Sequence, residues 1–231
     1  MKVIVFDIGG TLMEYREMPG VWIDLYPAAL VRVRRELLPE LTDAELSRSL
    51  EILRSYNPSV RYREREYPPE VIFGDACAHW PGSFSLQEVI RIFYGSMKLT
   101  PVLFPETADV LQQLRDAGYR IAALTDVATG MPDELHRDGC ADLMPFFDRY
   151  VSSLSCGWRK PNPGGLEDIA DSFGVSSSEM IMVGDERKDA EAAARFGCRA
   201  VVIDRRGRCP DFGQDWTFSD LSPLPGLLAG L

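Results

Sequence analysis

Three polar residues stand at the ends of short apolar runs in this chain: Asp7, Thr125 and Asp185. Lys160 lies on a loop between the last two. Paired carboxylates in a chain with 2 histidines favour a hard, oxygen-seeking cation, and Mg²⁺ is the simplest choice. One carboxylate can act as a nucleophile beside such a cation, while a lysine, a hydroxyl and backbone N–H groups hold phosphate oxygens. These residue types therefore indicate phosphoryl transfer through an aspartyl intermediate.

Short apolar strands that alternate with helices must position these side chains. The strands are expected at residues 2–6, 119–124, 180–183 and 199–203. An amphipathic helix is expected at residues 106–117, ended by Gly118. A helix rich in alanine is expected after Asp185, to about Phe196, and is ended by Gly197. The pattern predicts an α/β fold whose parallel sheet is covered on both faces, with the ligand beyond the carboxyl ends of the strands. The tail, residues 210–231, is expected to add a strand at Trp216–Phe218 and a short helix.

Residues 16–99 read as helices throughout and are expected to form a small domain inserted into a core of residues 1–15 and 100–231. Thr42–Glu45 and Ser85–Glu88 both match the capping box that begins many helices. Apolar residues at helical spacing predict a further helix before them, namely Trp22, Leu25, Leu30 and Val33.

Composition excludes several classes of protein. The chain has 231 residues, of which 45% are hydrophobic, and a formal charge of −10, which disfavours nucleic acid and anionic membranes as partners. No run is long enough for a spanning helix, and the first residues lack the layout of a signal peptide. The cysteines are odd in number and form no CxxC pair, which favours a reducing cytoplasm; they are Cys77, Cys140, Cys156, Cys198 and Cys209.

Four segments, taken in order, resemble the motifs of the haloacid dehalogenase superfamily of hydrolases, most of which are Mg²⁺-dependent phosphatases. They are Val3–Leu12, Leu124–Thr125, Gly157–Pro161 and Val183–Asp189. The family pattern is an apolar strand with Asp-x-Asp-Gly-Thr-Leu, a strand ending in Thr or Ser, a Gly-x-x-Lys-Pro loop, and a strand followed by Gly-Asp and a later Asp. The resemblance implies a Rossmann-like three-layer sandwich with a parallel sheet and a small α-helical cap domain.

The resemblance also implies a nucleophile and a metal site. Asp7 would be the nucleophile and a metal ligand. Asp185 would be the second metal carboxylate, and Asp189 would support it directly or through water. The backbone carbonyl of Gly9 would be a further ligand for Mg²⁺.

Four residues would hold the substrate in this family. Gly10, Thr125 and Asp126 would bind the phosphoryl group, Asp126 through its backbone N–H. Lys160 would neutralise charge on the nucleophile and on the substrate. The partner implied is a small phosphorylated metabolite, which the sequence does not identify.

Gly9 departs from the family pattern, which has Asp at this position as general acid and base. Such help is typically worth about 10²- to 10⁴-fold in rate. Four residues are candidates to replace it: Glu14, Glu17, Asp126 and His79. Asp126 is the first to test, because its backbone is expected at the site.

The departure leaves three hypotheses open: a Mg²⁺-dependent phosphatase with altered proton transfer, a catalytically weak protein that binds a phosphorylated ligand, and a hydrolase of another bond such as carbon–halogen. Family dehalogenases usually have Tyr where this chain has Gly9, and use no Mg²⁺. Phosphonatases use a Schiff-base lysine from the cap, but none of the four lysines lies well inside residues 16–99: Lys2, Lys98, Lys160 and Lys188.

Three arginines alternate with other residues in the helical region: Arg61, Arg63 and Arg65. If this stretch is extended, they share one face and would bind an anionic substrate. The other interpretation is a solvated loop whose charges Glu64 and Glu66 neutralise.

Overall fold

The computed structural model describes residues 2–18, 20–208 and 211–231. Cys209 and Pro210 lie outside the described residues. A six-stranded sheet, in which all neighbours are parallel, has the order β5-β4-β1-β6-β7-β8. Its strands are β1 (Val3–Phe6), β4 (Arg120–Thr125), β5 (Arg149–Ser152), β6 (Met180–Gly184), β7 (Arg199–Ile203) and β8 (Trp216–Phe218). The predicted α/β fold is confirmed.

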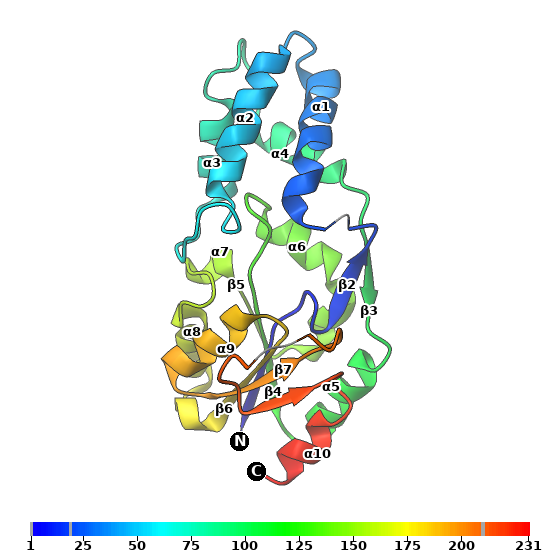
Figure 1. Cartoon of the computed structure of the whole chain (residues 1–231), viewed down its shortest axis with the longest axis vertical. Coiled ribbons are helices and arrows are strands. Elements are labelled where there is room, and N and C mark those ends of the chain that lie inside the picture. Colours follow the sequence, from blue (N-terminus) through cyan, green and yellow to red (C-terminus); the bar gives the residue numbers. More distant parts are fainter. Residues whose placement is uncertain (1, 19, 209–210) are drawn as a thin grey trace.

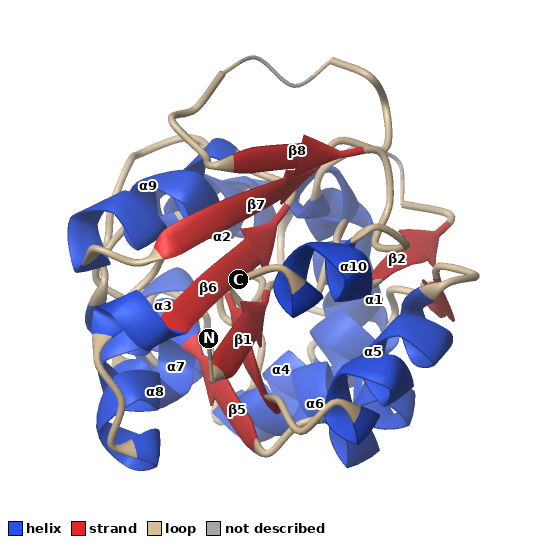
Figure 2. Cartoon of the chain, turned by 90° about the horizontal axis from the view of Figure 1, so that it is seen from below, coloured by secondary structure: helices blue, strands red, loops and turns tan. Residues whose placement is uncertain are grey.

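Helices cover both faces of this sheet, as the buried strands require (Figure 2). One face packs against α5 (Thr107–Asp116), η2 (Ala141–Phe146) and α10 (Leu224–Ala229), and the other against α8 (Gly164–Phe173) and α9 (Arg187–Phe196). Successive side chains of β1 enter opposite cores, because side chains alternate across a strand. Ile4 and Phe6 join the first core, and Val3 and Val5 join the second.

The central strand β1 lies between β4 and β6, and this arrangement determines which residues meet beyond the sheet. Phe6 pairs with Ala123 on one side and with Val183 on the other. The residues that follow these three strands therefore lie next to one another at the carboxyl edge.

The helical segment stands above that edge (Figure 1). It contains η1 (Trp22–Leu25), α1 (Tyr26–Leu37), α2 (Asp43–Tyr56), α3 (Pro69–Cys77) and α4 (Leu86–Gly95). The chain enters and leaves it through β2 (Met13–Arg16) and β3 (Thr100–Leu103), which pair with each other in antiparallel fashion. Its buried side chains form a cluster separate from the two cores of the sheet, joined from outside the segment by Met131.

Local details of the helical segment differ from the sequence predictions at two places and agree with them at a third. The single helix expected from Trp22 onward is divided into η1 and α1, and Pro27 stands in the first turn of α1. Thr42 and Glu45 form the expected capping box. Ser85 accepts a hydrogen bond from the Glu88 backbone N–H, but the reciprocal bond from the Glu88 side chain is absent.

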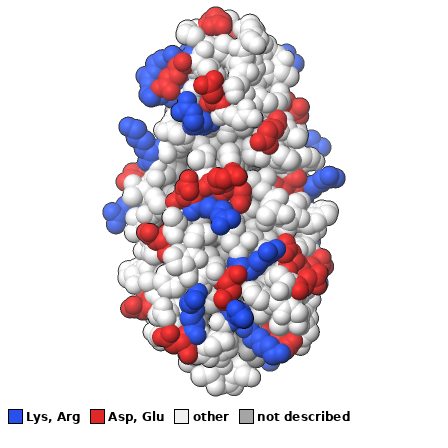
Figure 3. Space-filling view, turned by 180° about the vertical axis from the view of Figure 1, so that it is seen from behind, with Lys and Arg blue, Asp and Glu red and all other residues white. Residues whose placement is uncertain are grey.

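The surface seen in Figure 3 mixes acidic and basic side chains, without a large area of either sign. Among the described residues, no helix combines the length and the apolar character needed to cross a bilayer.

Candidate active site

Asp7 is the residue around which the strand-end site is built. It directly follows β1, and its backbone N–H donates to the Val183 carbonyl at 2.9 Å, so that the β1–β6 ladder fixes its position. The side chain is buried. Its Oδ1 atom accepts a hydrogen bond from Lys160 Nζ at 2.6 Å. A carboxylate and an ammonium group therefore meet at the end of the central strand.

Lys160 bridges two carboxylates that are far apart in the sequence. Its Nζ atom lies 2.6 Å from Asp7 Oδ1 and 2.6 Å from Asp189 Oδ1, and it donates to the Leu124 carbonyl at 3.1 Å. Burial alone lowers the pKa of Lys160, but the carboxylates of Asp189 and Asp7 outweigh this effect and hold the pKa above its ordinary value. The lysine is therefore a fixed positive charge.

Asp7, Asp185 and Asp189 each place one carboxylate oxygen within 4.8 Å of the other two. Burial, partly offset by Lys160, raises the pKa of Asp7 to about 6. Burial together with the charges of Asp7 and Asp189 raises the pKa of Asp185 to about 8. Three close carboxylates thus exceed what one lysine can neutralise.

This donor set fits a divalent cation that prefers oxygen ligands. Asp185 Oδ1 accepts a hydrogen bond from the Thr11 hydroxyl at 2.9 Å. In the part of the chain that is described, Lys160 pairs with Asp7 and Asp189, and no cationic side chain pairs with Asp185. The residues that can hold the ion are therefore Asp7, Asp185 and Asp189.

The two glycines in the loop after Asp7 differ in backbone conformation and in the space around them. Gly10 has φ +83°, and a Cβ there would lie 2.2 Å from Asp185 Oδ2, so a side chain would be strained and would displace Asp185. Gly9 is exposed, and a Cβ built on it would meet nothing within 4 Å. The turn therefore needs glycine at position 10, whereas position 9 has room for a side chain.

Thr125 and Asp126 lie beside this loop, at the end of β4. Thr125 is buried, and Asp126 Oδ1 accepts a hydrogen bond from the Lys160 backbone N–H at 3.1 Å. Burial raises the pKa of Asp126, but the positive charges of Lys188, Arg159 and Lys160 together hold it below its ordinary value. Asp126 is consequently ionised near neutral pH and has no proton to donate.

The other candidates for the missing acid are placed less favourably. Glu14 and Glu17 are both exposed on the connection to the helical segment. His79 Nε2 lies 3.0 Å from the Glu45 carbonyl in the first turn of α2. That turn is at the end of the helical segment farthest from the sheet (Figure 1), so His79 is remote from the strand ends.

Lys188 and Thr11 are site residues that sequence reasoning missed. Lys188 Nζ lies 3.3 Å from Asp126 Oδ2 and 2.6 Å from Glu186 Oε2. Lys188 lies inside the fourth motif. Its ion pair with Asp126 joins residues that follow two different strands, β6 and β4, so no local sequence pattern predicts it. Thr11 lies within the first motif, where its hydroxyl could have been considered as a partner for Asp185.

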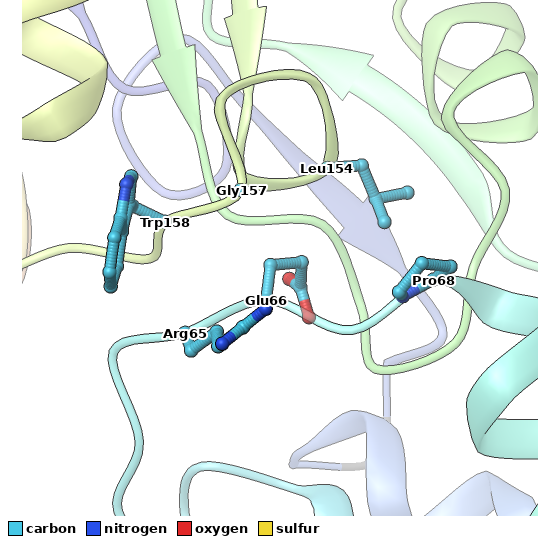
Figure 4. A pocket seen from close by; sticks show the side chains of 6 residues that line it. All are labelled: Arg65, Glu66, Pro68, Leu154, Gly157 and Trp158. Carbon is cyan, nitrogen blue, oxygen red and sulfur yellow. The ribbon is translucent and has the colours of Figure 1, made fainter.

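A segment from the helical region, residues 61–67, reaches the motif loop that carries Lys160; we call it the strap. The Glu66 backbone N–H donates to the Gly157 carbonyl at 2.9 Å, and the Arg159 N–H donates to the Glu64 carbonyl at 2.6 Å. Strap and loop, together with Pro68 and Leu154, line a groove of about 470 Å³ (Figure 4).

The strap does not gather its three arginines into one anion-binding set. Arg63 is partly buried and donates to the Tyr56 carbonyl at 2.7 Å and to Glu66 at 2.8 Å. Arg61 and Arg65 are exposed. Neutralisation within the strap is therefore the better interpretation for Arg63.

The chain is similar to known proteins in sequence and in fold. Over 207 residues the chain is 29% identical to a phosphoglycolate phosphatase of Nitrosospira multiformis, covering 88% of this chain and 83% of that protein. The crystal structure of a HAD phosphatase from Thermococcus onnurineus is similar in fold, with TM-score 0.67 and 22% identity over 100% of this chain and 99% of that one. A 2-haloacid dehalogenase from Pseudomonas syringae gives TM-score 0.73 and 22% identity, with the same coverage.

Both kinds of structural neighbour share the fold, and at this identity they show the fold alone. The model of the haloacid dehalogenase-like hydrolases matches residues 1–197, which is most of the chain. The chain therefore belongs to the haloacid dehalogenase-like hydrolase family.

Proposed function

We propose that the protein is a Mg²⁺-dependent phosphatase that acts on a small phosphorylated metabolite through an aspartyl phosphate on Asp7. The observation that carries this proposal is the cluster in which Lys160 lies 2.6 Å from both Asp7 and Asp189 while Asp185 has no cationic partner among the described residues. A dehalogenase without a metal does not need a third carboxylate in this position, whereas a cation site does.

In the first step, an Asp7 carboxylate oxygen forms a bond to phosphorus, and the bond from phosphorus to the leaving oxygen breaks with its electron pair. Lys160 holds Asp7 in place by the hydrogen bond to Oδ1 and offsets its charge. The Thr125 hydroxyl and the Asp126 N–H group bind the phosphoryl oxygens. The Gly10 N–H, expected from the sequence to do the same, already donates to the Met13 carbonyl at 2.7 Å. Asp7, Asp185, Asp189 and the Gly9 carbonyl would hold Mg²⁺, which would supply positive charge next to the transferring group.

In the second step, water forms a bond to phosphorus and the bond to Asp7 breaks, which regenerates the carboxylate and releases phosphate. No side chain at position 9 protonates the leaving oxygen in the first step or takes the proton of water in the second. We infer that substrates with good leaving groups, such as acyl phosphates, react faster than alkyl phosphates, and that hydrolysis of the intermediate is slow.

We further propose that residues 16–99 form a cap domain over the site, supported by their separate hydrophobic cluster and by the β2–β3 pair that joins them to the rest. A cytoplasmic location is proposed as well, supported by the free thiols of the described cysteines: Cys77, Cys140, Cys156 and Cys198.

One alternative function is favoured by a specific observation. Gly9 has no side chain, and the candidate replacements are exposed, remote or ionised. A protein that binds a phosphorylated ligand without turning it over would have this feature. Retention of the Asp7–Lys160 pair supports the phosphatase instead, since a binding protein does not need a nucleophile.

The test is release of phosphate from acetyl phosphate, p-nitrophenyl phosphate and 2-phosphoglycolate, measured with Mg²⁺ and with EDTA. The last substrate is included because the Nitrosospira relative is a phosphoglycolate phosphatase. Turnover should need Mg²⁺ and fall on the order of 10³-fold or more in Asp7→Asn, while exposed Asp142→Asn serves as the matched control. Binding of phosphate without turnover of any substrate would favour the binding protein.

A further inference from the structure

Asp126 places an additional carboxylate where an anionic substrate is expected to bind. Its side chain is 5% exposed, so its charge is poorly screened by water. One oxygen, Oδ1, accepts the Lys160 backbone N–H at 3.1 Å, which holds the carboxylate at the end of β4. A fixed negative charge at this position opposes the approach of a phosphoryl group to the Asp126 backbone N–H.

Lys188 meets the second oxygen of the same carboxylate. Its Nζ atom lies 3.3 Å from Asp126 Oδ2, and it also pairs with Glu186, whose side chain is 56% exposed. Lys188 lies in the first turn of α9, next to Asp189. The sheet brings this turn close to the end of β4, which Asp126 follows. The nearby Arg159 is already used, because its Nη1 atom donates to Glu66 and to the Val127 carbonyl.

The charges at the strand ends are unbalanced without this lysine. Five carboxylates gather there, those of Asp7, Asp126, Asp185, Glu186 and Asp189. Within the described residues, their ion pairs go to Lys160 and Lys188 alone. Lys160 serves Asp7 and Asp189, so Lys188 is the ion-pair partner of Asp126.

We propose that Lys188 is a positioning residue that neutralises Asp126 and thereby lets the strand end bind a phosphoryl anion. The inference rests on the proposed function, because it assumes that phosphoryl oxygens bind at the Asp126 N–H. It makes Asp126 and Lys188 a matched pair: the lysine is needed because the carboxylate is there.

A double-mutant cycle on the full chain tests this pairing, with inorganic phosphate in the presence of Mg²⁺ as the probe and calorimetry as the readout. Lys188→Met should weaken phosphate binding about tenfold, and Lys188→Arg should restore most of it. Asp126→Asn keeps an acceptor for the Lys160 N–H and removes the charge that Lys188 neutralises. In the Asp126→Asn background, Lys188→Met should have little further effect.

Kinetics give a second readout, in which Lys188→Met should raise KM more than it lowers kcat, and exposed Lys98→Met is the matched control. An equal loss in both backgrounds would overturn the inference, because Lys188 would then act on the anion directly. A loss of stability in Lys188→Met without a loss of phosphate affinity would also overturn the inference, because the Lys188–Asp126 pair would then have a purely structural role. If wild type neither binds phosphate nor turns substrates over, the proposed function fails first and this inference falls with it.

Discussion

At the scale of single residues, the site is governed by charge balance. Lys160 is shared by Asp7 and Asp189 at 2.6 Å each, and Asp185 is left with the neutral Thr11 hydroxyl. Burial and the neighbouring carboxylates then raise the pKa of Asp185 to about 8. Protons and a divalent cation are therefore competing ways to relieve the same repulsion.

This competition predicts how Mg²⁺ stabilises the protein at different pH. Asp185 has its pKa raised from 3.8 to about 8 on folding, so between these values the folded protein binds more protons than the unfolded chain. Stability without metal therefore decreases as pH rises through this range. Mg²⁺ removes the repulsion, so the increase in Tm on adding Mg²⁺ should be larger at pH 8 than at pH 5.5.

Thermal unfolding with and without Mg²⁺ at both pH values measures this difference. Burial lowers the pKa of His136 to about 4, so this residue also makes stability depend on pH. At a given pH its effect is the same with and without Mg²⁺, so it cancels from the Mg²⁺-induced shift in Tm. Asp185→Asn is the control, since it should lose most of the pH dependence of the Mg²⁺ effect. The same Mg²⁺-induced shift at both pH values in wild type would contradict the account.

At the scale of elements, the strand ends and their turns position the chemistry. Asp7, Thr125 and Asp185 were identified from sequence because each follows an apolar run, and parallel strands bring such ends to one edge. Strand β5 was missed, because it is short and begins with exposed Arg149 at the edge of the sheet. The Lys188–Asp126 pair was missed because it depends on where the first turn of α9 lies relative to the end of β4, which no local pattern encodes.

The turn after β1 predicts opposite effects at its two glycines. Gly10→Ala combines a positive φ with a Cβ that would lie 2.2 Å from Asp185, so it should lower the free energy of unfolding by about 1–3 kcal/mol and weaken Mg²⁺ binding. Gly9→Ala has open space and is the matched control, expected within about 0.5 kcal/mol of wild type. Urea titration measures both, and equal losses at the two positions would contradict the described turn.

At the scale of the whole molecule, the strap joins the helical segment to the loop that carries Lys160. Glu66 is buried there and binds Arg159, the Ser153 hydroxyl at 2.7 Å and Arg63 at 2.8 Å. Because Arg159 directly precedes Lys160, this contact couples the placement of the helical segment to the active-site loop. The helical segment was expected from sequence, but the contact of the buried Glu66 with the active-site loop was not.

Glu66 should therefore matter more for stability than its neighbour in the strap. Glu66→Ala leaves the buried Arg159 without its partner and should cost about 3–5 kcal/mol. Glu64→Ala removes a partly exposed ion pair with Arg195, and should cost about 1 kcal/mol or less. Denaturant unfolding of the two variants measures the contrast, and similar losses would mean that the strap is not anchored through Glu66.

The most direct test of the central claim is to look for the phosphoryl group on Asp7. Acetyl phosphate has a leaving group that needs no acid, whereas hydrolysis of the intermediate still lacks a base at position 9. Acid-quenched mass spectrometry with Mg²⁺ should therefore find a phosphoryl adduct on the Asp7 peptide of wild type. Asp7→Asn should show none, and Gly9→Asp should hold less adduct while releasing phosphate faster. Turnover that survives in Asp7→Asn, or no adduct and no gain in Gly9→Asp, would contradict the account.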